Sequence, residues 1–136
     1  MADSRYKNKS GLFETAANVL MSQAQYLPVP HSAYYSCYQM IKHIWLYKFN
    51  KSEEELQAQI SQNGAKASHE YLINQIIPLV TDSRDIAARR DFRNNLTQLK
   101  TLRTQADYSD TTVDRDFAEK AIRLMSELLR TLKRSA

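Results

Sequence analysis

The residues best suited to chemistry in this sequence stand together at positions 103–108. Arg103 is followed four positions later by Asp107, and Tyr108 comes directly after it. If the segment is helical, this spacing places the guanidinium beside the carboxylate. A partly buried Arg–Asp pair holds a helical bundle together, whereas a free guanidinium binds a phosphate through two parallel hydrogen bonds. The structural and the ligand-binding interpretation both stay open at this point.

Other basic side chains accompany Arg103 in two segments. They are Arg84, Arg89, Arg90, Arg93 and Lys100, and then Arg115, Lys120, Arg123, Arg130, Lys133 and Arg134. Such side chains neutralise phosphates and make binding salt-dependent. Acidic residues are interleaved with both sets, so solvated faces with exposed ion pairs explain the same pattern. The formal net charge of +4 permits an anionic partner without requiring one.

Residue supply excludes several kinds of site. Two glycines in the whole chain leave no Gly-rich phosphate loop. The single cysteine, Cys37, excludes a disulfide framework and a Cys-based zinc site, and we expect it to be an inert core residue. His31, His43 and His69 lack the spacing of metal ligands. We therefore predict neither a metal site nor a cofactor.

Helices must position these residues, because the composition leaves little for a β fold. The 136 residues include only 2 Gly and 3 Pro, far fewer than the turns of a sandwich or barrel need. Hydrophobic residues make up 43% and charged residues 25%, as in ordinary globular proteins. We predict one all-α domain over residues 1–136, with its core at about 10–134. Its architecture is an antiparallel bundle of four long helices and one short helix.

Caps and prolines define the first helices. Ser10 is the predicted N-cap of the first, which ends before the prolines at 28 and 30. The second, over about 30–49, is apolar almost all round, so other surfaces must cover several of its sides. Ser52 begins a capping box for a short helix that stops near Gly64.

The second half of the chain continues the pattern. A segment from Ser68 carries periodic apolar residues until Pro78 kinks or closes it. Asp82 or Ser83 is the predicted cap of a long helix that reaches about Asp107. A polar turn then leads into the last helix.

The second helix also suggests self-association. Its apolar circumference exceeds what a small monomer easily covers, so we predict a homodimer. Aromatic residues are enriched at protein interfaces. Tyr35, Tyr38 and Trp45 are therefore the residues that we expect near the contact.

Nothing in the sequence indicates a membrane. The first residues lack the apolar core of a signal peptide, and no apolar stretch reaches the roughly 20 residues of a spanning helix. We therefore predict a cytoplasmic protein without membrane contact.

Three segments, in this order, resemble motifs of the HEPN family (higher eukaryotes and prokaryotes nucleotide-binding domain). Tyr34-Tyr35 resembles the A-Y-Y-A helix of the family, and Ser68-His69 resembles its S-H-x-x-L segment. Residues 102–108 resemble its L-R-x-x-A-D-Y ending. Order and spacing are similar from about residue 12 to residue 132.

The resemblance implies a helical bundle that usually dimerises in prokaryotic toxin–antitoxin, defence or RNA-processing systems. It also implies a nucleotidyltransferase-type protein as a partner. Catalytic members of the family are metal-independent ribonucleases with an Arg followed, after four to six residues, by a His. There the Arg stabilises phosphate charge and the His moves a proton at the 2′-hydroxyl.

This sequence departs from that motif, since no Arg is followed by His at that spacing. The equivalent place after Arg103 holds Tyr108, and a phenol is a poor general base at neutral pH. We therefore predict a non-catalytic, HEPN-like module that binds RNA, a nucleotide or a protein partner. The candidate binding residues are Arg93, Lys100, Arg103, Asp107 and Tyr108.

Two alternatives remain. The first is a metal-independent ribonuclease that uses Arg103 with Tyr108 or His69. The second is a structural helical adaptor whose basic faces are only solvated.

Overall fold

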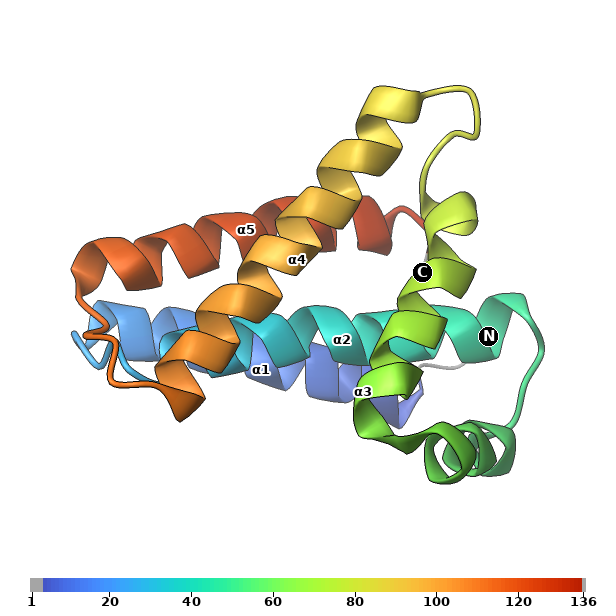
Figure 1. The fold of residues 1–136 in the computed structure, drawn as a ribbon, viewed down its shortest axis with the longest axis horizontal. Coiled ribbons are helices and arrows are strands. Elements are labelled where there is room, and N and C mark those ends of the chain that lie inside the picture. The colour runs from blue at the N-terminus through green and yellow to red at the C-terminus, as the bar shows by residue number, and fades with distance from the viewer. Residues whose placement is uncertain (1–3, 136) are drawn as a thin grey trace.

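The computed structural model describes residues 4–135, and over this range it contains helices and no strand. In chain order the helices are α1 (Arg5–Ser22), α2 (Val29–Lys48), α3 (Glu53–Val80), α4 (Ile86–Tyr108) and α5 (Arg115–Lys133) (Figure 1). The predicted all-α bundle is confirmed. None of these helices combines the length and the apolar character needed to cross a bilayer.

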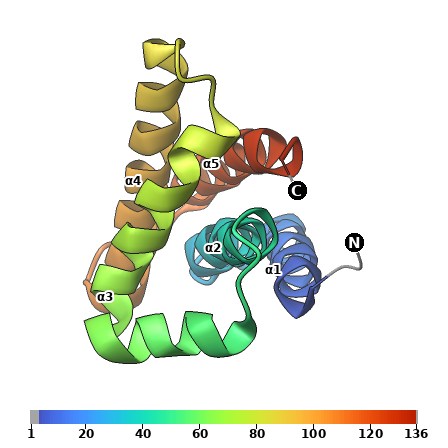
Figure 2. The same cartoon turned by 90° about the vertical axis from the view of Figure 1, so that its right-hand side faces the viewer.

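Helix α2 lies at the centre of the arrangement. Figure 2 looks along it, with α1 and α5 on one side and α3 and α4 on the other. All four other helices pack on α2, which explains why its sequence has no broad polar face. The buried side chains of α2 include Ala33, Tyr34, Cys37, Met40, Ile41 and Ile44.

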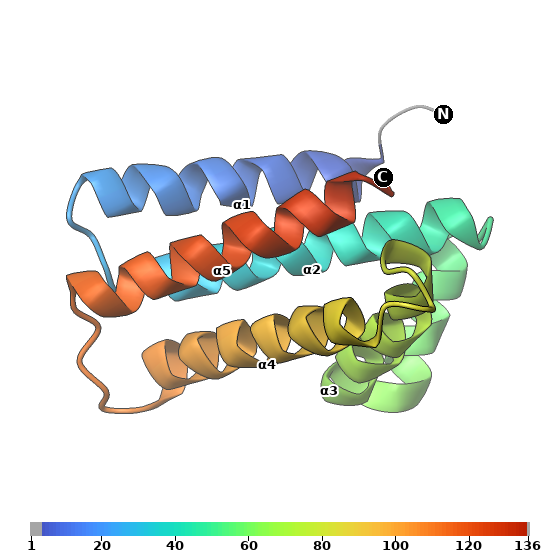
Figure 3. The same cartoon turned by 90° about the horizontal axis from the view of Figure 1, so that it is seen from above.

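The bundle is less regular than the uniformly antiparallel one that we predicted. Helix α1 runs against α2, but α2 and α5 run in the same direction (Figure 3). Helix α4 crosses this layer obliquely, and its first turns project beyond it (Figure 1). Through α3 and α4 the chain returns to the end of the molecule at which α2 begins, and α5 starts there (Figure 3). The cavities described below lie along this oblique part.

The packing of α2 removes the argument for a dimer through that helix. Tyr38 and Trp45 are each only 2% exposed, so they lie inside the single chain. Tyr35 is half-buried and contacts α4 through Arg103. The chain covers its own central helix, and self-association stays a prediction without support from these residues.

The first helix begins earlier than predicted. Its N-cap is Ser4, whose Oγ accepts from the Lys7 backbone N–H, and the helix starts at Arg5. Ser10 is instead buried within the helix and donates to the Ser36 carbonyl at 2.7 Å. A hydroxyl that looked like a cap therefore ties α1 to α2. The two roles are indistinguishable in sequence because both use the same short side chain.

A similar displacement occurs before α4. Asp85, and neither Asp82 nor Ser83, is the N-cap, and its Oδ1 accepts from the Ala88 N–H at 2.9 Å. Asp82 accepts from the Arg84 N–H within the preceding turn. Three polar residues that favour caps stand in this stretch, so the sequence alone does not choose among them.

The expected start and break of α3 are confirmed. Ser52 and Glu55 form a reciprocal capping box, with bonds of 3.1 and 2.9 Å. Gly64 has φ 78° and ψ 164°, and this non-helical residue separates α3 into two helical parts. Pro78 lies in the last turn, before the helix ends at Val80.

The central position of α2 makes a stability prediction. Ile41 is fully buried there, so Ile41→Ala should lower the free energy of unfolding by about 2–5 kcal/mol in a denaturant titration. Ile86→Ala is the matched control, because Ile86 is 77% exposed and should change it by less than about 0.5 kcal/mol. Equal effects of the two substitutions would contradict this account of the core.

Candidate functional site

The Arg103 side chain joins α4 to α2. Its Nη2 donates to Tyr35 Oη at 2.9 Å and to Tyr108 Oη at 3.4 Å, while Nε lies 3.2 Å from Asp107 Oδ2. The side chain is 14% exposed, and its Nε has an ion pair but no hydrogen-bond partner among the described residues. The predicted Arg103–Asp107 pair is confirmed, and the guanidinium keeps unused donor capacity.

Two tyrosine rings lie close to this guanidinium. The Arg103 Cζ lies 5.0 Å from the Tyr35 ring centroid and 5.2 Å from that of Tyr108. Both distances suit cation–π attraction, which is strengthened where water is partly excluded. The cation is therefore held in one place before any ligand arrives.

Asp107 also reaches a histidine that the sequence analysis set aside. Its Oδ2 lies 2.9 Å from His31 Nδ1, and the His31 ring packs against Tyr35 with centroids 4.7 Å apart. These two residues are 76 positions apart, so only the fold brings them together. The signal in the sequence is the spacing of four between His31 and Tyr35, which places both on one helix face.

His69 approaches the same region from α3. Its Nδ1 lies 2.8 Å from Tyr34 Oη, and its ring stacks on Tyr38 with centroids 3.8 Å apart. Burial raises the pKa of Tyr34 above its usual value, so this phenol keeps its proton and can donate it to Nδ1. Because Tyr34 is the donor, Nε2 carries the ring hydrogen.

Three cations surround His69. Burial, followed by Lys100, Lys42 and Arg103, lowers its pKa to about 4. The imidazole is therefore neutral at neutral pH. Positive charge from α2 and α4 thus converges on one partly buried place, where an anion would be favoured.

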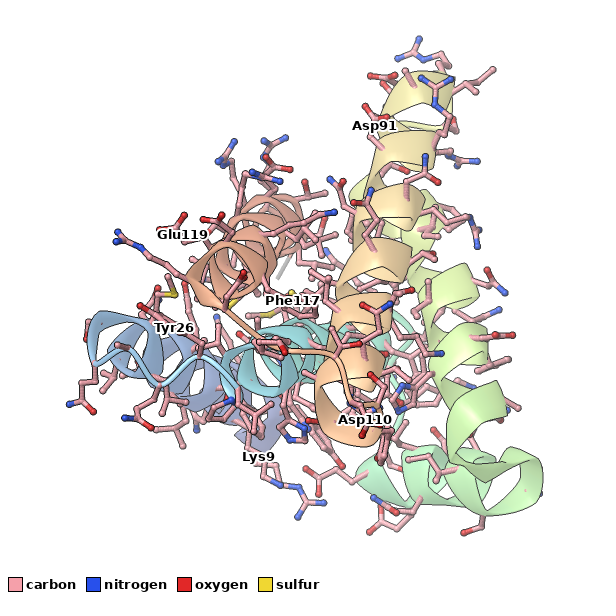
Figure 4. All side chains as sticks on the ribbon, turned by 60° about the vertical axis from the view of Figure 1, so that its left-hand side comes forward. Lys9, Tyr26, Asp91, Asp110, Phe117 and Glu119 are labelled. Carbon is pink, nitrogen blue, oxygen red and sulfur yellow. The ribbon has the colours of Figure 1, made fainter. Side chains whose placement is uncertain are left out.

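An open cavity of about 670 Å³ occupies the space between α2, α3 and α4. It is lined by Tyr35, His69, Lys100, Thr101, Arg103, Thr104, Gln105 and Tyr108. In Figure 4, Asp91 marks the projecting start of α4 and Asp110 lies just beyond its C-terminal end, so the α4 residues that line the cavity stand between these two labels. Five residues that the sequence singled out therefore line one cavity: Tyr35, His69, Lys100, Arg103 and Tyr108.

The other predicted site residues lie nearby. Asp107 supports Arg103, and Arg93 lines a neighbouring cavity together with Lys100. The three segments that carry the family resemblance also meet here: Tyr34 contacts His69, and Tyr35 contacts Arg103. The structure brings these candidates to one side of the bundle, whereas Trp45 stays in the core.

Metal and thiol chemistry find no support in the described part of the chain. Over residues 4–135, no three His, Cys, Asp or Glu side chains come together as ligands for a metal ion. Cys37 is fully buried, and burial raises the pKa of its thiol, which disfavours the reactive thiolate.

Comparison with protein-family models, with curated proteins and with solved structures found no match. The resemblance to HEPN domains therefore stays a prediction, and the geometry of the cavity has to carry the functional argument.

The lowered pKa of His69 predicts how the stability of the fold depends on pH. We expect the His69 imidazole, followed by NMR, to titrate near pH 4. An unfolded chain has the ordinary His pKa of about 6.5 and binds this proton more readily, so acidification favours unfolding. The free energy of unfolding should fall as the pH drops from about 6.5 to about 4.

His69→Gln should remove this contribution and flatten the pH dependence of stability over that window. A His69 midpoint at its ordinary value would show that burial and the nearby cations Lys100, Lys42 and Arg103 do not act on the imidazole as described.

Proposed function

We propose that this protein binds RNA or a nucleotide in the cavity between α2, α3 and α4. Arg103 and Lys100 contact phosphate, and the Tyr108 ring stacks on a base. The observation that carries the proposal is the presence of both cations and this exposed ring on one cavity wall.

The cations suit phosphate for a physical reason. Arg103 is largely buried and held by Tyr35 and Asp107, so little side-chain entropy is lost when a ligand binds. Lys100 stands about one turn earlier on the same helix and faces the same space. Charge-assisted bonds from a partly desolvated guanidinium are stronger than those of a fully exposed one.

Tyr108 adds a preference for a base. Its side chain is 72% exposed at the end of α4, although its ring packs beside the Arg103 guanidinium. Exposed aromatic rings next to cations are typical platforms for stacking single-stranded nucleic acid. Inorganic phosphate would contact Arg103 and Lys100 but make no stacking contact with the Tyr108 ring.

Under this proposal the chain is a HEPN-like module that binds without cleaving. Its place beside a nucleotidyltransferase-type protein or in a defence system, and its assembly as a dimer, belong to the same proposal and rest on the resemblance. Because no His stands at the spacing of the family's ribonuclease motif, we assign binding, and not cleavage, to the residues of the cavity.

A ribonuclease is the second candidate, because His69 shares the cavity with Arg103. To accept the proton of a 2′-hydroxyl while the guanidinium stabilises the phosphate, the neutral imidazole would have to use Nδ1, which already accepts from Tyr34. A group with a pKa of about 4 is also a weak base, and Tyr108 is no better suited. Binding therefore needs fewer assumptions than cleavage.

The binding proposal predicts that purified protein retains labelled single-stranded RNA in EDTA, and that retention falls as salt rises. Lys100→Ala and Tyr108→Ala should each weaken binding by roughly threefold to tenfold, the size of one lost phosphate contact or stacked base. Arg103→Ala should weaken it further. Fluorescence anisotropy measures all three, and denaturing gels of the same samples report cleavage.

Arg123→Ala is the matched control, since Arg123 is an exposed arginine on α5 away from the cavity. Equal losses in Arg103→Ala and Arg123→Ala would mean diffuse attraction to the basic surface and would overturn the proposal. Cleavage that disappears in Arg103→Ala or His69→Gln would promote the ribonuclease. RNA that is neither held nor cut would leave a protein partner or the adaptor role.

A further inference from the structure

A second cavity continues from the first along the space between α3 and α4. Its volume is about 330 Å³, and Asn74, Arg93, Glu70 and Lys100 are among the residues that line it. Lys100 lines both cavities, so its side chain lies where the two adjoin. Of the residues that line the second cavity, only Lys100 is used above to contact a single phosphate.

We propose that the second cavity holds the continuation of the same ligand, which makes the ligand a single-stranded RNA several nucleotides long and not a free mononucleotide. This inference rests on the proposed function, because it takes Arg103 and Tyr108 as one end of the binding site.

The three cations form a row and not a cluster. Arg93, Lys100 and Arg103 all stand on α4 and line the two cavities in sequence order. Arg103 stands ten positions after Arg93 on the helix, which corresponds to a rise of about 15 Å. A single phosphate cannot reach both ends of such a row, whereas the backbone of a short single strand can.

Arg93 is positioned for this role by a contact across the groove. Its Nη1 donates to Asn74 Oδ1 on α3 at 3.0 Å. This bond holds an otherwise exposed guanidinium against the second cavity, and no other described residue is seen to occupy its remaining donors, which suit a phosphate. Arg90, three residues earlier, is also exposed but does not line this cavity, so the row has a defined end.

Glu70 indicates which kind of polyanion the second cavity binds. A carboxylate accepts hydrogen bonds and repels phosphate, so it would oppose a chain made only of phosphates. RNA also carries donors, namely the 2′-hydroxyl of each ribose and the amino groups of its bases. A carboxylate in the same cavity as Arg93 and Lys100 therefore favours RNA over inorganic polyphosphate.

The test is a length series. Adenylate oligomers, from the mononucleotide up to about eight nucleotides, are titrated against the full chain by fluorescence anisotropy. Affinity should rise over the first few nucleotides and then level off. Arg93→Ala should weaken the longest oligomer by roughly threefold to tenfold and leave the mononucleotide unchanged, while Arg103→Ala should weaken both.

Salt dependence supplies a second readout. The slope of log K against log salt for the longest oligomer should shrink by about 0.7 in Arg93→Ala. Arg93→Lys should restore the slope, because it keeps the charge even though it changes the bond to Asn74. Arg90→Ala is the control from the same helix, and it should match the wild type in both affinity and slope.

The outcomes separate the two proposals. Mononucleotide binding that needs Arg103 but does not strengthen with length, or strengthens without any effect of Arg93→Ala, overturns this inference alone. Binding of inorganic polyphosphate as tight as that of the longest oligomer overturns the assignment to RNA. The absence of Arg103-dependent binding at every length overturns the proposed function and this inference together.

Discussion

The ion pair between Arg103 and Asp107 is the contact on which the rest of the site depends. Through it α4 acquires a fixed guanidinium, which Tyr35 of α2 and the terminal Tyr108 then hold in place. The same carboxylate oxygen meets His31, so one side chain organises groups from both helices. An isolated cation at this depth would be costly, and pairing it with Asp107 makes its partial burial tolerable.

The central helix supplies the other half of this arrangement. Four helices pack against α2 and hold its tyrosines in place. The adjacent residues Tyr34 and Tyr35 each contact a different polar partner. Tyr34 takes His69 of α3, and Tyr35 takes Arg103 of α4. Packing thereby sets the width of the cavity, while the charges along α4 set its electrostatic character. On this account, residues along the oblique α3–α4 part bind the ligand, and the packing around α2 stabilises the fold.

Much of this could be predicted from local sequence, but the long-range contacts could not. Low Gly and Pro content, apolar periodicity and the Ser52 capping box predicted helices at nearly the right places. The Arg103–Asp107 pair followed from a spacing of four within one helix. The roles of Ser10 and His31 were missed, because each depends on a residue from another helix or a distant segment, Ser36 and Asp107 respectively. Tyr38 and Trp45 were assigned to a dimer contact because the sequence does not show how completely one chain covers its own helix.

The central claim is that a ligand's phosphate meets Arg103 and Lys100 while a base rests on Tyr108. A crystal structure of the protein with a short adenylate oligomer tests it most directly. The account predicts phosphate density within hydrogen-bond distance of the Arg103 and Lys100 side chains, with Arg103 still paired to Asp107 and a base parallel to the Tyr108 ring. Phosphate density on the basic face of α5 would contradict the account. So would phosphate density at Arg103 with the ion pair between Arg103 and Asp107 broken.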